Sequence, residues 1–274
     1  MCVLKAEWKK LITFRELYAA LILAVCMTLW GTIPYARDPR GFWINVYNFN
    51  VNIASILILF LQVAGLSRLF CCECAGRTDA LIRVGRFGLR DTFAPKLALG
   101  LGYGVVSSLF PGLLSFCLNA LLCGGVPAPF GAGYSVSRIP LWETAGPLAL
   151  WGWEMLFSLL GGLCAAGLVL LCSALARRPA AAMAGAALCL ALPAALQVGL
   201  VILFSRFPLP QGLAIIAEVL YQLSSCAWSG ILSYDAQLLG SDGAPLWRPI
   251  LYCLCLLGAE LALTWAVWNR RARK

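Results

Sequence analysis

Few side chains in this sequence have the types and spacing that catalysis requires. Histidine is absent from all 274 residues, which excludes imidazole-based catalysis and histidine-ligated zinc. Glu154 and Glu260 lie within long apolar runs, where an ionisable group is costly and marks a candidate functional position. We expect Glu154 at a membrane interface, beside Trp151 and Trp153. Glu260 is deeper, so it either pairs with a neighbouring helix, faces a water-filled path or stays protonated.

Three asparagines, Asn45, Asn48 and Asn52, recur at i, i+3 and i+7 and share one face if their segment is helical. Such a polar stripe either lines a translocation path or forms hydrogen bonds across a helix interface. We therefore take these asparagines, together with Glu260, as candidate residues of a translocation path.

Thirteen cysteines suggest a disulfide framework only until they are placed along the chain. Most lie in apolar runs, where cysteine behaves as a small hydrophobic residue. Cys71, Cys72 and Cys74 form one tight cluster, but it lacks the second CxxC pair or histidine arm of a zinc site. We predict neither a catalytic site nor a metal site in this chain.

The elements that position these residues follow from composition. Hydrophobic residues make up 61% of the chain, charged residues 12%, and the mean hydropathy is +0.84, which excludes an ordinary soluble domain. Windows of about 20 uncharged residues predict an all-α polytopic membrane protein with six transmembrane helices in a single domain, 1–274. The predicted spans are 17–36, 44–67, 97–123, 148–176, 180–205 and 250–268.

The remaining segments have predicted places on either side of the membrane. They are an N-terminal helix at 1–16, a cytoplasmic segment at 71–94, an outer loop at 124–147, an outer segment at 206–248 and a basic tail at 269–274. Residues 213–232 are apolar but contain Glu218 and follow a proline-rich break. We interpret them as re-entrant or interfacial helices packed against the bundle.

Charge bias sets the orientation. With six spans, sixteen of the 21 Lys and Arg residues lie on the side of the two termini. The positive-inside rule then places both termini in the cytoplasm. A seventh full span would move the basic tail to the outside, which is why 213–232 is not counted as one.

The N-terminal helix is predicted to be amphipathic. Apolar side chains fall on one face and lysines on the other, which suits a helix lying on an anionic membrane surface. The membrane-surface residues are Lys5, Trp8, Lys9 and Lys10. The alternative is a solvated extension of the first span, since basic residues commonly flank spans.

Residues 68–96 form a polar insertion between two apolar spans. Gly76 permits a sharp turn, and the helix-compatible run 78–84 presents Leu81 and Ile82 among charged neighbours. A short helix with apolar knobs and a charged rim suits a cleft on a partner domain. The candidate docking residues are Glu73, Gly76, Asp79, Leu81, Ile82, Arg83 and Arg86.

The pattern Glu73-x-x-Gly76, Asp79-Ala-Leu-Ile82, a turn at Gly85-Arg86 and Lys96 before a span resembles the coupling-helix segment of ABC-2 type ABC transporter permeases, the transmembrane subunits of bacterial ABC exporters. Residues 5–11 are similar to the amphipathic elbow helix of that family. The six-span order and the apolar excursion before the last span also match.

This resemblance implies a permease in the bacterial plasma membrane that pairs with a second permease, as a homodimer or a heterodimer, and docks separate ATP-binding subunits. The chain has no Gly-Lys dipeptide and hence no phosphate-binding loop of the form GxxxxGK[ST]. We therefore expect no cofactor on this chain, ATP and Mg²⁺ on the partner subunit, membrane lipids as further partners and no nucleic acid.

Two other classes remain open. An integral membrane enzyme acting on lipid-linked substrates would need a convergent site, and the outer acidic residues Glu143, Asp235 and Asp242 are scattered along the sequence. An ion-coupled secondary transporter would need an essential membrane carboxylate such as Glu260 or Glu154 and often shows repeat symmetry between its halves.

Overall fold

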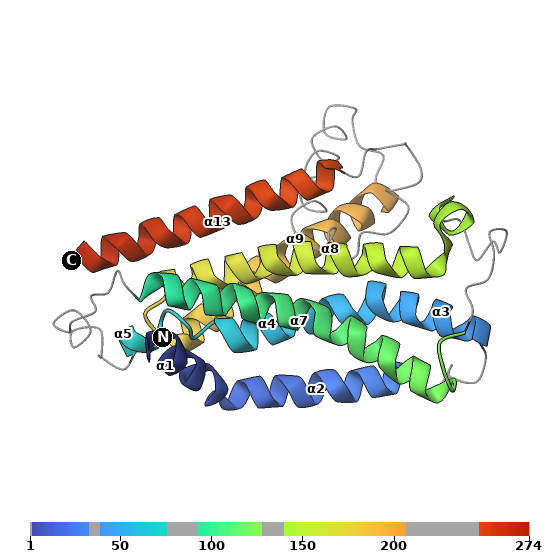
Figure 1. The fold of residues 1–274 in the computed structure, drawn as a ribbon. Helices are drawn as coiled ribbons and strands as arrows, with labels where there is room; N and C mark the ends of the chain where they lie inside the picture. Colours follow the sequence, from blue (N-terminus) through green and yellow to red (C-terminus); the bar gives the residue numbers. More distant parts are fainter. Residues whose placement is uncertain (1, 33–38, 76–91, 128–139, 207–246, 274) are drawn as a thin grey trace.

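The structure is a computed structural model that describes residues 2–32, 39–75, 92–127, 140–206 and 247–273. Every regular element in these ranges is helical, so the predicted all-α class is confirmed there (Figure 1). In chain order the helices are α1 (Cys2–Ile12), α2 (Arg15–Thr32), α3 (Pro39–Phe49), the π-helix η2 (Asn50–Ala54), α4 (Ser55–Leu66), α5 (Cys72–Ala75), α7 (Phe93–Leu122), α8 (Pro140–Leu175), α9 (Pro179–Arg206) and α13 (Trp247–Arg273).

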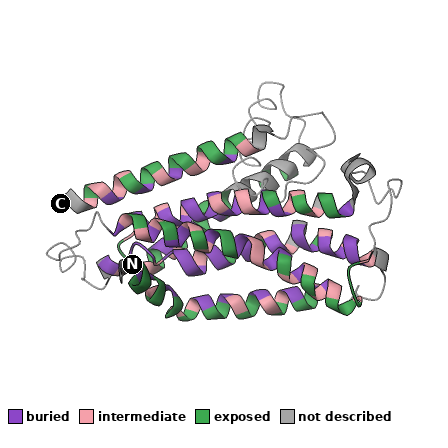
Figure 2. Cartoon of the chain, in the orientation of Figure 1, coloured by how far each residue is buried: buried purple, intermediate pink, exposed green. Residues whose placement is uncertain are grey.

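Among the described residues, four helices are long and apolar enough to cross a membrane. They are α2, α7, α8 from Pro147 onward, and α13 from Ile250 to Arg271, with mean hydropathies between 1.2 and 2.3. Their outward faces carry large apolar side chains that the protein leaves uncovered, and exposed positions run along α2 and α13 in Figure 2. Because water does not tolerate apolar surface of this extent, these helices indicate a multi-pass membrane protein.

Two further apolar helical runs accompany these four. Helices α3, η2 and α4 follow one another from residue 39 to residue 66, and α9 extends over 28 residues. The predicted spans 44–67 and 180–205 fall on these two runs. A π-turn shifts the side-chain register relative to an α-helix, so η2 changes which faces of the first run meet the bundle.

Several observed bounds differ from the predicted ones. Helix α1 ends at Ile12 and α2 begins at Arg15, so the N-terminal helix is shorter than 1–16. Helix α7 begins at Phe93, inside the predicted cytoplasmic segment, and α8 begins at Pro140, inside the predicted outer loop. The apolar part of α8 runs from Pro147 to Leu175, close to the predicted span 148–176, and the helix extends beyond it to Pro140 because proline is tolerated in the first turn of a helix. The predicted segment 213–232 lies outside the described residues.

Helix α8 occupies the centre of the bundle and contacts α4, α7, α9 and α13. Its inner face is fully buried at Val169, Leu170 and Ala174. A helix surrounded by other helices has little contact with lipid, so its stability depends on close packing against its neighbours. Small residues provide it: a Cβ on Gly104 of α7 would lie 3.0 Å from Ala166 Cβ of α8.

Candidate functional site

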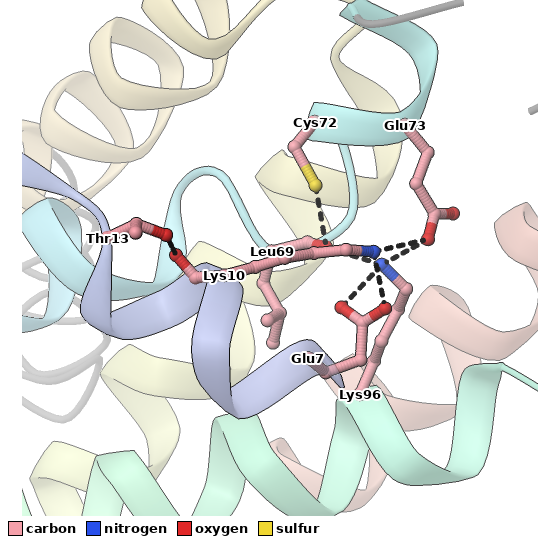
Figure 3. A network of polar contacts seen from close by, with 7 residues as sticks. All are labelled: Glu7, Lys10, Thr13, Leu69, Cys72, Glu73 and Lys96. Atoms are coloured by element: carbon pink, nitrogen blue, oxygen red, sulfur yellow. Dashed lines mark hydrogen bonds and ion pairs between the residues drawn. The ribbon is translucent and has the colours of Figure 1, made fainter. Parts of the chain in front are cut away.

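Four charged side chains meet where α1, α5 and the start of α7 come together (Figure 3). We call Glu7, Lys10, Glu73 and Lys96 the ionic cluster. Lys96 Nζ lies 2.9 Å from Glu73 Oε1 and 3.3 Å from Glu7 Oε2. Lys10 Nζ lies 2.7 Å from Glu7 Oε1 and 3.6 Å from Glu73 Oε1. Two lysines balance two glutamates, so the cluster carries no net formal charge.

Lys96 is the centre of the cluster and is completely buried. Its ammonium group also donates a hydrogen bond of 2.8 Å to the carbonyl of Leu69. The rings of Phe70 and Trp268 lie 5.8 and 5.9 Å from Nζ, within the range of a cation–π contact. A buried cation is tolerated when opposite charge is near, and two carboxylates lie within 3.3 Å of Lys96 Nζ.

The cluster also affects the ionisation of the groups at its edge. Partial burial of Lys10 opposes its charged form, but the hydrogen bond to Glu7 and the charges of Glu7 and Glu73 outweigh burial and raise the pKa of Lys10. Burial raises the pKa of the Cys72 thiol, and the nearby charges of Lys96 and Lys10 only partly offset that rise. Cys72 is therefore a poor nucleophile and a poor metal ligand near neutral pH.

The turn between α1 and α2 holds α1 in place. Thr13 Oγ1 lies 2.8 Å from the carbonyl oxygens of both Lys9 and Lys10, and its one hydroxyl hydrogen is shared between these acceptors at the end of α1. Arg68, just before α5, pairs with Glu16 at the start of α2. The chain around α5 thus contacts α1 through the pair of Glu73 and Lys10, and contacts α2 through the pair of Arg68 and Glu16.

The segment before α5 is fixed from the other side by α8 and α13. The backbone N–H of Phe70 donates a hydrogen bond of 3.0 Å to Ser173 Oγ of α8. The ring of Phe70 packs edge-on against Trp268 of α13, with centroids 5.0 Å apart. Glu73 is 2% exposed as a result of this packing, so the ionic cluster belongs to the structural core of this end of the bundle.

The structure brings together residues from two separately predicted groups. Glu73 was predicted to belong to a docking segment and Lys10 to a membrane surface, and both lie in the ionic cluster. Lys5, Trp8 and Lys9 are exposed on α1. The other predicted docking residues lie outside the described residues, and they are Gly76, Asp79, Leu81, Ile82, Arg83 and Arg86.

Sequence reasoning missed Glu7 and the burial of Lys96. The i, i+3 spacing of Glu7 and Lys10 was a usable signal, because such pairs lie on one side of a helix. Glu7 is nevertheless 3% exposed, and its second oxygen faces a lysine from a distant part of the chain. A pair separated by so much sequence leaves no local pattern.

The predicted path residues are placed differently from one another. Asn45 is buried and its Nδ2 donates a hydrogen bond of 2.8 Å to Asn119 Oδ1 of α7. Asn48 is exposed, and the side chain of Asn52 lies outside the described part of the structure. Whether these residues line a path stays a prediction.

Further polar contacts join α4, η2, α7 and α8 within the apolar bundle. Gln62 Nε2 donates hydrogen bonds to Gly162 O at 2.8 Å and to Ser108 Oγ at 3.2 Å. Asn50 Nδ2 donates to Glu154 Oε2 at 3.2 Å, which ties the predicted interfacial carboxylate to the π-helix. Such bonds stabilise helix contacts in a membrane because the same groups have no water to bind there.

Glu260 lies on α13 and is 7% exposed. Its carboxylate packs against Gly167 of α8, where any added Cβ would overlap Glu260 Oε2. Oε2 makes no hydrogen bond to the described residues. The glycine makes room for the carboxylate between the two helices.

Within the described residues, no group of three or more His, Cys, Asp or Glu side chains is arranged to hold a metal ion. Cys71 and Cys72 lie in or beside α5, and Cys71 is buried with its Sγ 3.2 Å from Ser67 O. The site is thus a junction of helices held together by ion pairs, and its charged groups stabilise the contact between the helices.

The chain was compared with known protein families and with curated protein sequences. No protein-family model matches the chain, and no curated protein sequence is similar to it.

Proposed function

We propose that this chain is the membrane-spanning permease subunit of an ATP-driven ABC-2 type exporter. One observation carries the proposal: the ionic cluster joins both ends of the predicted docking segment. Glu73 lies just before residues 76–91, Lys96 lies just after them, and the two side chains are paired at 2.9 Å. A segment held at both ends by a buried ion pair is suited to transmit the motion of a partner to the helices behind it.

The contacts around the cluster support this role. Lys96 belongs to α7, Glu7 to the N-terminal helix, and Trp268 beside them to α13. A force applied to the docking segment would reach all three helices at one point. Because the charges are buried, breaking them apart is costly, and the connection resists deformation.

The arrangement of helices supports a six-span topology. In Figure 1 the start of α1 and the end of α13 lie at the same end of the bundle, as an even number of crossings requires. Helices α2, α7, α8 and α13 supply four crossings. The run from α3 to α4 and helix α9 supply two more in this proposal, with α1 as an elbow helix at the cytoplasmic face of the bacterial plasma membrane.

Energy would come from separate subunits. In this proposal ATP and Mg²⁺ bind to two ATP-binding chains that dock on the cytoplasmic segment 71–94, because the sequence of this chain contains no phosphate-binding loop. The permease pairs with a second permease, and the substrate crosses between them. Asn48 is exposed, whereas Asn45 is buried and bound to Asn119.

Site-specific photocrosslinking tests the docking surface. A benzoylphenylalanine at position 81 should form an adduct, in membranes of the native host, with a protein that contains a GxxxxGK[ST] loop. The same probe in place of Leu121, which is 77% exposed near the far end of α7, should not. The purified adduct partner should hydrolyse ATP with Mg²⁺, and Leu81→Glu should abolish its copurification. An adduct equally strong from both positions, or no ATP-binding partner from position 81, contradicts the proposal.

One observation favours a second candidate function, an ion-coupled transporter. Glu260 is buried between α8 and α13, and its Oε2 has no hydrogen-bond partner among the described residues. In that case Glu260→Gln abolishes proton flux into liposomes that contain the purified chain and an entrapped pH dye. An ATP-driven permease instead shows no proton flux alone, with or without the substitution.

A further inference from the structure

A groove of about 610 Å³ runs between α1 and α7, outside the ionic cluster. We call it the α1–α7 groove. It is lined by Leu4, Lys5, Trp8, Ala98, Leu99, Gly102 and Tyr103. Among the described lining residues Lys5 is the one charged side chain, and the others are apolar or aromatic. The volume falls within the range of small-molecule binding sites, about 300–1,000 Å³.

The walls of the α1–α7 groove are held open by specific contacts. The hydroxyl of Tyr103 donates a hydrogen bond of 2.8 Å to the carbonyl of Leu61, so its polar end is already satisfied. The Tyr103 ring lies where a Cβ on Gly65 would sit 2.5 Å from Cζ, which fixes the ring against α4. A Cβ on Gly102 would meet nothing within 4 Å. The groove is therefore empty beside Gly102 and rigid beside Tyr103.

Charge and apolar surface lie side by side on α1. At about 100° per residue, Leu4, Trp8 and Ile12 form one stripe, and Lys5 and Lys9 form the stripe next to it. All three apolar side chains are exposed, by 46, 51 and 40%. Lys5 forms no ion pair with the described residues. This combination leaves a free cation above an apolar channel.

We propose that the α1–α7 groove binds one anionic phospholipid, with its phosphate at Lys5 and one acyl chain between Trp8 and Gly102. The groove follows α7, a helix apolar enough to cross a membrane, so an amphiphile reaches it directly from the bilayer. Ala98, Gly102 and Tyr103 lie within two turns of buried Lys96, near the start of α7, where a headgroup meets the lipid boundary. Trp8 has the amphipathic ring that favours this boundary.

A second groove in the same molecule provides an internal comparison. It has a volume of about 510 Å³, lies between α4 and α9, and is lined by apolar side chains such as Phe60, Met183 and Leu190. Its described lining residues carry no charge that would select a headgroup. Selectivity for anionic lipid is therefore expected at the α1–α7 groove and not at the α4–α9 groove.

Photoreactive lipids test the proposal on the full chain in nanodiscs. The probes are phosphatidylglycerol and phosphatidylcholine with identical acyl chains that carry a diazirine, and adducts are located by peptide mass spectrometry. Phosphatidylglycerol should label α1 and residues 98–103 more strongly than phosphatidylcholine. The two lipids should label the α4–α9 groove equally.

Matched variants distinguish specific binding in the α1–α7 groove from a general electrostatic attraction between basic residues and anionic lipid. Lys5→Gln should lower phosphatidylglycerol labelling about fivefold, the effect of one lysine near an anionic surface. Lys9→Gln removes the same charge from the same helix outside the groove lining and should change labelling little. Gly102→Leu should reduce labelling about fourfold for each methylene displaced, whereas Gly258→Leu, also in open space on α13, should not.

Four results would overturn the proposal. They are equal labelling by the two lipids at the α1–α7 groove, equal losses in Lys5→Gln and Lys9→Gln, unchanged labelling in Gly102→Leu, and crosslinks between two protein copies at this groove in place of lipid adducts. Circular dichroism and gel filtration identify any misfolded variant, and Gly102→Ala then serves as the milder replacement. The proposal does not depend on an ATP-binding partner, so it stands or fails separately from the permease function.

Discussion

The lysines of α1 and the lysine near the start of α7 have different roles because their surroundings differ. Lys96 is fully buried among carboxylates and rings, Lys10 lies at the edge of the same cluster, and Lys5 and Lys9 face outward. The energetic weight of a charge depends on burial: an exposed ion pair contributes little, whereas a buried one is costly to break. Lys96 is therefore the residue on which this end of the bundle most depends.

Lys96→Met should destabilise the protein by about 3–5 kcal/mol, because it leaves Glu7 and Glu73 buried without their central cation. The free energy of unfolding, measured by denaturant titration in micelles, checks this value. Lys9→Met, which removes an exposed lysine, is the matched control and should change stability little. Adding Glu7→Gln and Glu73→Gln to Lys96→Met should recover part of the loss, and no recovery would show that charge is not the cause.

The raised pKa of Cys72 predicts slow alkylation near neutral pH. In a variant whose sole cysteine is Cys72, the rate with iodoacetamide should keep rising as the pH passes above 9, the ordinary thiol value, since only the thiolate reacts. Lys10→Gln removes a positive charge that stabilises the thiolate, so it should slow the reaction further at each pH. The protein unfolded in denaturant is the reference, and an equal rate in both states would contradict the burial of this thiol.

Helix contacts in the bundle depend on glycine at defined positions. An added Cβ on Gly162 of α8 would lie 2.7 Å from Ser108 Cβ of α7 and would overlap Ser108 Oγ. The carbonyl of Gly162 also accepts the hydrogen bond from Gln62 of α4. Three helices therefore meet at one glycine, and the packing there tolerates no side chain.

Gly162→Ala should destabilise the protein by about 1–3 kcal/mol, the usual cost of overpacking a core. Ser108→Gly in the same chain should restore part of this loss by removing the overlapping atoms. Gly185→Ala, where an added Cβ meets nothing within 4 Å, should be neutral or stabilising because alanine favours the helix. Thermal unfolding of the four proteins checks the series, and equal losses at positions 162 and 185 would refute it.

On the scale of the whole molecule, charge distribution and chain direction agree. The start of α1 and the end of α13 lie at one end of the bundle (Figure 1), and most basic residues belong to the segments predicted there. At that end Arg271 Nη2 donates a hydrogen bond of 2.7 Å to the carbonyl of Leu175, which joins the last turns of α13 and α8. At the end of the molecule where most basic residues are predicted, α13 and α8 are therefore linked by a hydrogen bond.

Reporter fusions test the predicted orientation. A fluorescent protein fused after Lys274 should fluoresce, because its side of the membrane is predicted to be the cytoplasm. Alkaline phosphatase fused after Gly125, beyond the opposite end of α7, should be active because it folds only outside. Active phosphatase at the C-terminus, or inactive phosphatase at Gly125, would reverse the orientation.

Hydropathy and length were sufficient to predict the helical class, since apolar runs such as that of α7 are long and uninterrupted. The ends of helices were predicted less well, because α8 begins at Pro140 and α7 at Phe93, each before the uncharged run from which the span was predicted. The ionic cluster could not be predicted from the sequence, because Glu7 and Lys96 are far apart along the chain and meet only in the folded bundle. The π-helix η2 was likewise missed, as a change of register has no hydropathy signal.

The pairing of Glu7 with Lys96 also has a consequence for biogenesis. Helix α1 precedes α7 in the chain, so during synthesis the carboxylate of Glu7 has no Lys96 to pair with until α7 has been made. At about 5–20 residues per second, the wait is on the order of 4–18 s. Until Lys96 emerges, Glu7 has Lys10 of its own helix as its partner, and its pairing is completed only after α2, α3 and α4 have been made.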